Sequence, residues 1–409
     1  MLRGPRRHDR AAGPAVTARA GHAVEHRLSA FGTTVFAEMS ELAARTRSVN
    51  LGQGFPDTDG PAEIVEAAVR ALRDGRGNQY PPGAGVPELR EAVAEHQRRW
   101  YGLTYDPDTE VLVTAGATEA IAATLLALVR PGDEVIALEP YYDSYAACIE
   151  LAGGTRVPVT LRPHGGEFRL DLDELRDAVT ERTRLLLINT PHNPTGTVLT
   201  RAELATIAEL AVERDLLVVM DEVYEHLVFG GVHVPAATLP GMRERTISIG
   251  SAGKTFSFTG WKVGWVTARP ELVAVVRSAK QYLTYVSSGP FQYAVAEALR
   301  LPDDYFTSFR EDLRGKRNLL VSGLESVGFE VYAPAGTYFA TVDIRPLGES
   351  DGVAFCRSLP DRVGVVAIPN QVFYDVPERG APFVRFAFCK QISVLEEAIA
   401  RLRGVKFLA

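Results

Sequence analysis

Between about residues 111 and 251, short apolar runs alternate with stretches of helical periodicity, and this alternation constrains the fold more than any other feature. The apolar runs cover residues 111–116, 134–140, 184–191, 216–222 and 246–251. Helix-like stretches between them include residues 118–129 and 201–214. Strands this continuously apolar are usually buried on both faces of a parallel sheet that helices cover. We therefore predict an α/β fold around a mostly parallel sheet.

The character of the sequence changes after about residue 300. A long helical stretch and a short final helix, at 303–327 and 393–402, enclose three strand-like pieces at 337–342, 363–367 and 383–388. We predict a large domain at 51–298 and a smaller α/β domain at 299–409, joined by an N-terminal arm at 31–50.

Residues 1–30 form a basic segment rich in Arg, Gly and Ala. It lacks the apolar core of a secretory signal, and we expect a disordered extension. A transit peptide is the alternative, because the segment is rich in Arg and poor in acid, but amphipathic periodicity and serine are lacking.

Overall charge and cysteine content exclude several classes of protein. The formal net charge of -7 gives no attraction to nucleic acid or to anionic lipid. No run approaches the roughly 20 apolar residues that a membrane-spanning helix needs. Cys148, Cys356 and Cys389 are far apart and form no CxxC pair, which favours a reducing, cytoplasmic setting. We expect no nucleic-acid partner, no membrane partner and no bound metal.

The strongest candidate for chemistry is the segment SAGKTFSFTGWKVGW at 251–265. A lysine amine is a good nucleophile toward carbonyl carbon. Ser251, Lys254 and Lys262 together could hold a phosphorylated aldehyde through a covalent bond, a hydroxyl and a cation. Taken by itself, Lys254 could equally be an ordinary solvated lysine.

A second candidate, DEVYEHL at 221–227, ends a predicted apolar strand. A carboxylate buried there is costly unless it is paired, and a protonated pyridine nitrogen would be a suitable partner for Asp221. Tyr224 could then reach a phenolic oxygen on the same ring. The alternative for Asp221 is a helix N-cap, which is common where a strand turns into a helix.

Two further segments follow predicted strands. NTPHNPTG at 189–196 has a turn composition and presents Asn193 as a second donor to the ring oxygen. TAGATEA at 114–120 joins a strand to a helix N-terminus, where backbone N–H groups favour a phosphate.

Aromatic and cationic residues complete the set. EPYYDSY at 139–145 places paired aromatic rings after a strand, where either ring could stack on a heterocycle or pack in the core. VRFAFCK at 384–390 puts Arg385 inside an apolar strand, where its guanidinium needs a carboxylate from the protein or from a substrate.

Taken together and in order, these segments resemble the class I aminotransferases of the type I pyridoxal-phosphate fold. NLGQGFPD, NQYPPGAG, NPTG, DEVYEHL, SAGKTFSFTGWKVGW and VRFAF carry the resemblance, which runs from about Phe31 to the C-terminus. It is nearest to the branch of kynurenine, glutamine and methionine aminotransferases and of actinobacterial N-succinyldiaminopimelate aminotransferases. The resemblance implies a seven-stranded sheet in the large domain, pyridoxal 5'-phosphate as cofactor, and a homodimer.

The resemblance also implies a role for each matching residue. Lys254 would form the Schiff base and move the proton, Asp221 would pair with the pyridine nitrogen, and Tyr224 and Asn193 would bind the ring oxygen. Tyr142 would stack on the ring. The phosphate would be held by Ser251, Lys262, the backbone of Gly116, Ala117 and Thr118, and Tyr80 of the neighbouring subunit. Arg385, with Asn193 and the backbone of Gly54, would bind the substrate carboxylate.

The substrate expectation depends on where the chain departs from the kynurenine branch. Ser287, Ser288, Gly289 and Thr118 stand where that branch carries bulkier residues. We expect a roomier, polar pocket, with N-succinyl-L,L-2,6-diaminopimelate and 2-oxoglutarate as the substrate pair. Kynurenine, methionine or glutamine transamination is the alternative.

Two other functional classes fit the same fold. A cysteine-conjugate β-lyase would use the same lysine to expel a β-leaving group. A ligand-sensing regulator would need a DNA-binding segment, and the residues before the resemblance are too few and too rich in Gly for a helix-turn-helix.

Overall fold

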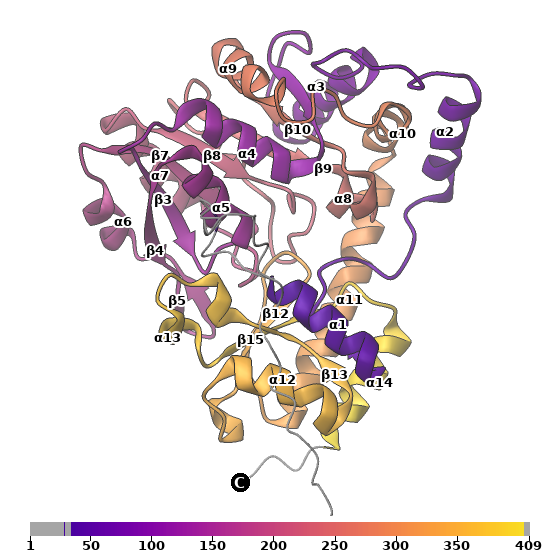
Figure 1. The fold of residues 1–409 in the computed structure, drawn as a ribbon, viewed down its shortest axis with the longest axis vertical. Coiled ribbons are helices and arrows are strands. Elements are labelled where there is room, and N and C mark those ends of the chain that lie inside the picture. The colour runs from indigo at the N-terminus through magenta and orange to yellow at the C-terminus, as the bar shows by residue number, and fades with distance from the viewer. Residues whose placement is uncertain (1–27, 29–33, 405–409) are drawn as a thin grey trace, which may run out of the picture.

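The computed structural model describes residue 28 and residues 34–404 of the 409-residue chain. Its upper part in Figure 1 is built on a large sheet, and its lower part on a smaller one. Apart from Leu28, the basic extension expected at 1–30 lies outside the described residues.

The large sheet has seven strands in the order β2-β10-β9-β8-β7-β3-β4. Their bounds are β2 Val111–Thr114, β3 Glu134–Glu139, β4 Thr155–Thr160, β7 Thr183–Asn189, β8 Leu217–Asp221, β9 Thr246–Ser251 and β10 Gly264–Thr267. Only β10 runs antiparallel to its neighbours within this sheet. The prediction of an α/β fold with a mostly parallel, seven-stranded sheet is confirmed.

Helices cover both faces of this sheet because alternate residues of its strands point to opposite sides. Leu185 and Leu187 of β7 pack with α4 (Gly116–Leu128), α5 (Asp143–Ala152) and α9 (Pro270–Lys280). Leu186 and Ile188 pack with α6 (Leu172–Ala178) and α7 (Arg201–Glu213) on the other side. Three further helices, α2 (Ala62–Arg73), α3 (Pro87–Tyr101) and α10 (Gly289–Leu299), pack over the β2–β10 end. A short hairpin, β5 (Arg162–His164) and β6 (Glu167–Arg169), follows β4.

The smaller sheet is antiparallel, with the order β11-β12-β15-β14. Its strands are β11 Glu330–Tyr332, β12 Phe339–Asp343, β14 Ile368–Pro369 and β15 Phe383–Ala387. The helices of this part are α11 Asp303–Val327, α12 Gly352–Val363, α13 Pro377–Gly380 and α14 Ile392–Arg403. α11 and α14 pack against each other.

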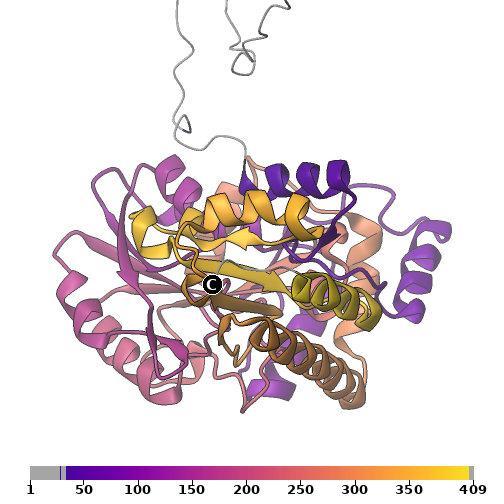
Figure 2. The ribbon, with the colours of Figure 1, turned by 90° about the horizontal axis from the view of Figure 1, so that it is seen from below.

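The N-terminal elements join the C-terminal ones. α1 (Val35–Thr46) lies beside α12 in Figure 2, and β1 (Val49–Asn50) pairs in parallel with β13 (Val365–Val366). The arm expected at 31–50 is therefore described from residue 34 onward and packs on C-terminal elements. The domain boundaries at 50/51 and 298/299 stay a prediction.

Two strand predictions differ from the structure. The piece expected at 337–342 begins at Phe339, because Thr337 has a left-handed backbone with φ of 65° and cannot continue a strand. The piece expected at 363–367 is divided, since α12 runs to Val363 and ends at Gly364 with φ of 68°. Within residues 34–404, no helix combines the length and apolarity that a membrane crossing requires.

Candidate active site

The carboxyl ends of β7, β8 and β9 and the N-terminus of α4 face a common cavity of about 370 Å³. Phe36 of α1, Phe339 of β12 and Arg385 of β15 line its other side. Parallel strands end on one side of a sheet, and ligands of open α/β folds bind there. The cavity therefore combines groups from both parts of the molecule.

Most of the residues predicted for the site line this cavity. They are Gly54, Gly116, Ala117, Thr118, Tyr142, Asn193, Asp221, Tyr224, Ser251, Lys254, Lys262 and Arg385. Tyr80 does not line it: its side chain is 80% exposed, and its ring meets that of Tyr285 at 5.5 Å between centroids. The role predicted for Tyr80, in a neighbouring subunit, stays a prediction.

Lys254 lies in α8 (Ala252–Thr255), directly after β9. Ser251 begins this short helix and accepts a hydrogen bond from the backbone N–H of Gly253 at 3.2 Å. The Lys254 amine donates to the hydroxyl of Tyr338 at 3.0 Å. Burial lowers the pKa of Lys254 to about 8, so an appreciable share of this amine is neutral near neutral pH. A neutral amine is the nucleophilic form that bonds to an aldehyde.

Asp221 is the last residue of β8, and its side chain is 5% exposed. It accepts one hydrogen bond from the Tyr145 hydroxyl at 2.5 Å and another from the backbone N–H of Val223 at 3.3 Å. Burial raises the pKa of Asp221 to about 6. Asp221 therefore caps a turn and not a helix, and its carboxyl group lines the cavity, where a cationic ring nitrogen would stabilise it.

Arg385 is almost fully buried and is stacked on Phe339, with 4.0 Å from the guanidinium carbon to the ring centroid. It donates to the side-chain oxygen of Asn193 at 2.8 Å and to the carbonyl of Gly52 at 3.0 Å. Within the described residues Arg385 forms no ion pair, so the alternative of a structural salt bridge is wrong there. Burial lowers its pKa to about 10, which leaves it charged and able to bind a carboxylate.

Asn193 is fixed from two sides. Its side-chain oxygen is occupied by Arg385, and its backbone N–H donates to the side chain of Asn189 at 2.7 Å. Asn189 in turn donates to the backbone carbonyl of Asp221 at 2.8 Å. With its oxygen in use, Asn193 presents N–H donors to the cavity, as the prediction of a bond to a ring oxygen requires.

The segment around Gly116 forms a cradle that suits a phosphate. A Cβ on Gly264 would lie 2.7 Å from the carbonyl carbon of Gly116, so only glycine allows these backbones to approach. Gly116 itself has φ of 77° and lies against Lys262, whose amine would be 3.2 Å from a Cβ at that position. A helix N-terminus, the hydroxyls of Thr118 and Ser251, and the Lys262 cation form a donor set that fits a phosphate monoester.

Tyr141 and Tyr142, the paired aromatic residues, lie in different surroundings. Tyr142 lines the cavity and meets Tyr145 edge to face at 5.9 Å between centroids. Tyr141 is buried elsewhere, where it hydrogen-bonds to Asp375 and lies under the guanidinium of Arg156. The alternative of core packing therefore describes Tyr141, and Tyr142 is the ring that a planar heterocycle would meet.

Two residues that contact predicted site residues, Tyr145 and Tyr338, were not predicted from the sequence; Tyr145 lines the cavity, whereas Tyr338 lies outside its lining. Tyr145, which holds Asp221, lies three residues after Tyr142, and this spacing places both on one helix face. The sequence could therefore have placed Tyr145 beside Tyr142, but not its hydrogen bond to Asp221. Tyr338 gives no such signal, because it meets Lys254 only through the packing of the two parts of the molecule.

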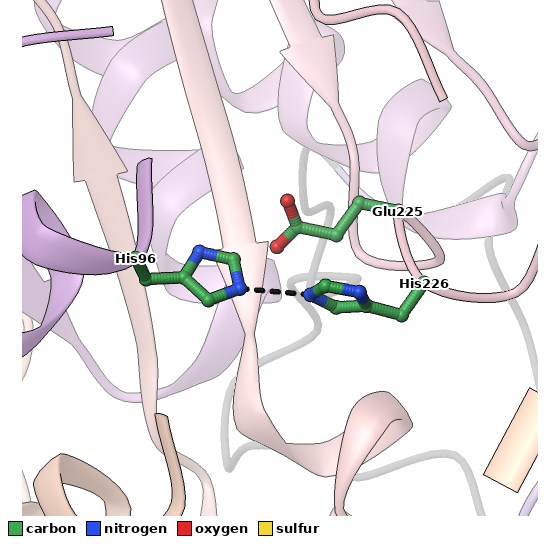
Figure 3. A group of neighbouring side chains, drawn as sticks. All are labelled: His96, Glu225 and His226. Carbon is green, nitrogen blue, oxygen red and sulfur yellow. Dashed lines mark hydrogen bonds between the residues drawn. The ribbon is translucent and has the colours of Figure 1, made fainter. Parts of the chain in front are cut away.

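A second polar cluster lies in the core, outside the lining of this cavity, and consists of His96, Glu225 and His226 (Figure 3). The two imidazole Nε2 atoms are hydrogen-bonded to each other at 2.8 Å. Two ligands of a tetrahedral zinc ion would be about 3.3 Å apart, given Zn–N distances of about 2.0–2.1 Å. Because each ring uses the other as its partner, this arrangement is that of a hydrogen-bonded core pair.

Comparison with known proteins gives a consistent result. The family model described as Aminotransferase class I and II matches residues 46–402. A probable N-succinyldiaminopimelate aminotransferase of Mycobacterium tuberculosis is 54% identical over 386 residues, which cover 92% of this chain and 97% of that protein. A methionine aminotransferase of Escherichia coli is 41% identical over 380 residues, with 93% and 97% covered.

A solved structure agrees with these sequence matches. The structure of N-succinyldiaminopimelate aminotransferase from Mycobacterium tuberculosis superimposes with a TM-score of 0.91 at 55% identity, covering 93% of this chain and 99% of that one. The resemblance predicted from the motifs is confirmed.

Proposed function

The chain belongs to the class I and II aminotransferase family and is a pyridoxal-phosphate-dependent transaminase, and we propose that its substrates are N-succinyl-L,L-2,6-diaminopimelate and 2-oxoglutarate. The observation that carries the substrate choice is 54% identity, over nearly the whole chain, to a relative named for that succinylated amino acid. This reaction would belong to lysine and diaminopimelate biosynthesis.

The cavity supports the general part of this function through the charges on its wall. Among the described residues, its cations are Lys254, Lys262 and Arg385. Lys262 lies at the phosphate cradle and Lys254 is the candidate for the covalent bond to the cofactor. Arg385 therefore remains as the partner for the α-carboxylate that every amino-acid and 2-oxo-acid substrate carries.

The chain's own residues would divide the reaction as follows. Arg385, held by Asn193, binds the α-carboxylate and directs the α-carbon toward Lys254. The Lys254 amine removes the α-proton and returns it on the cofactor side, as general base and then general acid. The bound cofactor supplies an electron sink for the resulting carbanion. Asp221 keeps the proton on the ring nitrogen, and Tyr224 and Asn193 donate to the ring oxygen.

The small residues predicted to make the substrate pocket roomy and polar do not all line the cavity. Thr118 lines the cavity, which agrees with a polar wall. Ser287, Ser288 and Gly289 do not line it; Ser287 accepts a hydrogen bond from Gln292, and Ser288 donates one to the carbonyl of Trp261. The succinyl preference therefore depends on the relatives more than on these serines.

A homodimer and a cytoplasmic location complete the proposal. The exposed rings of Tyr80 and Tyr285 meet near the N-terminus of α4, where a second subunit would cover them. Cys148, Cys356 and Cys389 are buried free thiols, which suits a reducing compartment.

A panel of amino donors with 2-oxoglutarate tests the substrate. We expect kcat/KM for the succinylated diaminopimelate to exceed that for methionine, kynurenine and glutamine by about tenfold or more, since one well-placed polar contact gives about 1–3 kcal/mol. A preference for methionine or kynurenine would contradict the substrate choice. Release of pyruvate and ammonia from a cysteine conjugate without an oxo acid would reveal a β-lyase.

Lys254→Ala tests the assignment of the lysine. We expect turnover to fall by more than about 10³-fold, because both the covalent bond and the proton transfer are lost. Lys316→Ala, which removes a lysine paired with Asp312 outside the cavity, is the matched control and should leave turnover unchanged. Multiple turnovers by Lys254→Ala at the wild-type rate would refute the assignment.

A further inference from the structure

Tyr338 joins the two parts of the molecule at Lys254. It precedes β12, and its side chain is fully buried. Its hydroxyl lies 3.0 Å from the Lys254 amine and 2.6 Å from the carbonyl oxygen of Gly54. The ring meets that of Tyr224 edge to face, at 5.3 Å between centroids. One hydroxyl therefore contacts the candidate proton carrier and the segment expected to bind the substrate carboxylate.

The directions of these two hydrogen bonds follow from the groups involved. A carbonyl oxygen can only accept, so the single proton of the Tyr338 hydroxyl is donated to Gly54. The hydroxyl oxygen is then an acceptor, and it receives an N–H from Lys254. Burial raises the pKa of Tyr338 well above 10, so it keeps its proton and does not act as a base.

The segment 52–55 is held by three side chains from the C-terminal part. Arg385 donates to the carbonyl of Gly52, Tyr338 to that of Gly54, and Lys390 to that of Phe55 at 2.7 Å. A Cβ on Gly54 would lie 2.5 Å from the Phe339 ring, so this backbone has little room to move. Of the three donors, Tyr338 is the one that also bonds to Lys254.

We propose that Tyr338 is a positioning residue, which holds the Lys254 amine when that amine is not bonded to the cofactor and couples its orientation to the segment around Gly54. A neutral amine has two N–H groups and one lone pair. Fixing one N–H on Tyr338 limits where the lone pair can point, and the lone pair is what takes the substrate α-proton. Substrate carboxylate and amine are thus oriented through one shared hydroxyl.

Tyr338→Phe tests the coupling because it removes the hydroxyl and keeps the ring. We expect kcat to fall about tenfold or more, with a smaller change in KM, since general acid–base steps lose about 10²–10⁴-fold when the proton carrier is absent altogether. The isotope effect of an α-deuterated substrate should increase, because proton transfer becomes slower relative to the other steps.

A measurement on the cofactor-free protein gives a second readout. A hydrogen bond accepted from an ammonium stabilises the charged form, so its loss should lower the pKa of Lys254 further. The pH dependence of the rate at which added pyridoxal phosphate is captured, followed by absorbance, should therefore shift to lower pH by about half a unit or more. A merely structural tyrosine would not move this profile.

Tyr332→Phe is the matched control. Tyr332 is a buried tyrosine of the neighbouring strand β11, and its ring packs on Phe168 and Phe383. We expect it to leave the isotope effect and the capture profile unchanged. If Tyr338→Phe does not fold, 3-fluorotyrosine at 338, whose hydroxyl is a weaker acceptor, should shift both readouts in the same direction by less.

The proposal rests on the role proposed for Lys254, and the outcomes separate the two. If Tyr338→Phe or the fluorinated protein matches Tyr332→Phe in isotope effect and capture profile while Lys254→Ala is inactive, the coupling is refuted and the lysine assignment stands. If Lys254→Ala turns over normally, the proposed mechanism itself fails.

Discussion

Asp221, Glu225 and His226 lie within six consecutive residues, but they belong to two buried polar clusters of different character. Asp221 ends β8 and faces the cavity with Lys254 and Asn193. Glu225 and His226 belong to the turn that follows, and they lie in the packed core beside His96 of α3 (Figure 3).

Perturbed acidity does not distinguish the two clusters. Burial raises the pKa of Asp221 to about 6 and that of Glu225 to about 7. Perturbed groups mark functional sites only in a probabilistic way. The two clusters differ in their partners. Inside the core, Glu225 interacts with Tyr101, and His96 is hydrogen-bonded to His226. Asp221 and Arg385 instead line a cavity that a ligand could enter. An open cavity with charged groups, and not a shifted pKa alone, marks the candidate active site.

We expect the largest difference between the two clusters when one carboxylate in each is neutralised. We expect Asp221→Asn to reduce kcat/KM by about 100-fold or more, because the charge that stabilises the protonated ring is lost. Glu225→Gln is the matched control and should stay within about threefold of wild type in a steady-state assay. Equal losses in the two variants would mean that the core cluster also takes part in the reaction.

The next effect concerns Arg385, the cation proposed to bind the substrate carboxylate. Arg385→Gln should raise KM for both amino and oxo acids by about 30-fold or more, since loss of one partner of a buried charge pair costs about 2 kcal/mol or more. Arg345→Gln removes an exposed arginine paired with Asp343 and should leave KM unchanged. An unchanged KM in Arg385→Gln would remove Arg385 from the substrate site.

A smaller effect, on stability, is expected in the core cluster. His96→Gln should lower the free energy of unfolding by about 1–3 kcal/mol, because His226 loses its hydrogen-bond partner in the core. Turnover should stay within about threefold of wild type. Denaturant unfolding and a rate assay on the same preparation check both parts, with the exposed hairpin variant His164→Gln as control. A stable but inactive His96→Gln would assign this cluster a functional role.

The smallest effect is a pH dependence of stability in the cofactor-free protein. Glu225 has a raised pKa, so its contribution is present at low pH and is lost as the pH rises through about 7. Burial lowers the pKa of His96 to about 3, and its contribution has the opposite sign: it is present above about 6.5 and is lost on acidification.

Glu225→Gln separates the contribution of Glu225 to stability from the opposing contribution of His96. The difference in unfolding free energy between wild type and Glu225→Gln should decrease from pH 5 to pH 8, because only wild type loses the Glu225 contribution. Denaturant titrations at several pH values measure it. A difference that is constant with pH would mean that Glu225 titrates normally in the folded protein.

Much of the fold could be predicted because its signals are local. The apolar runs at 184–191 and 216–222 became β7 and β8, and the helix predicted at 303–327 has the bounds of α11. The failures were at 337–342 and 363–367, where left-handed residues, Thr337 and Gly364, interrupt the regular elements. Hydrophobic periodicity records neither the helix-ending glycine at 364 nor the left-handed backbone of Thr337.

The family, the parallel sheet and the residues proposed to carry the chemistry could all be predicted from the sequence, because short contiguous segments such as those around Asp221 and Lys254 encode them. The folded chain alone shows that Tyr145 holds Asp221, that Tyr338 links Lys254 to Gly54, and that His96 meets His226 in the core. These contacts join residues 76, 84, 284 and 130 positions apart. Packing of helices and sheets brings them together, and no local pattern specifies which side chains then meet.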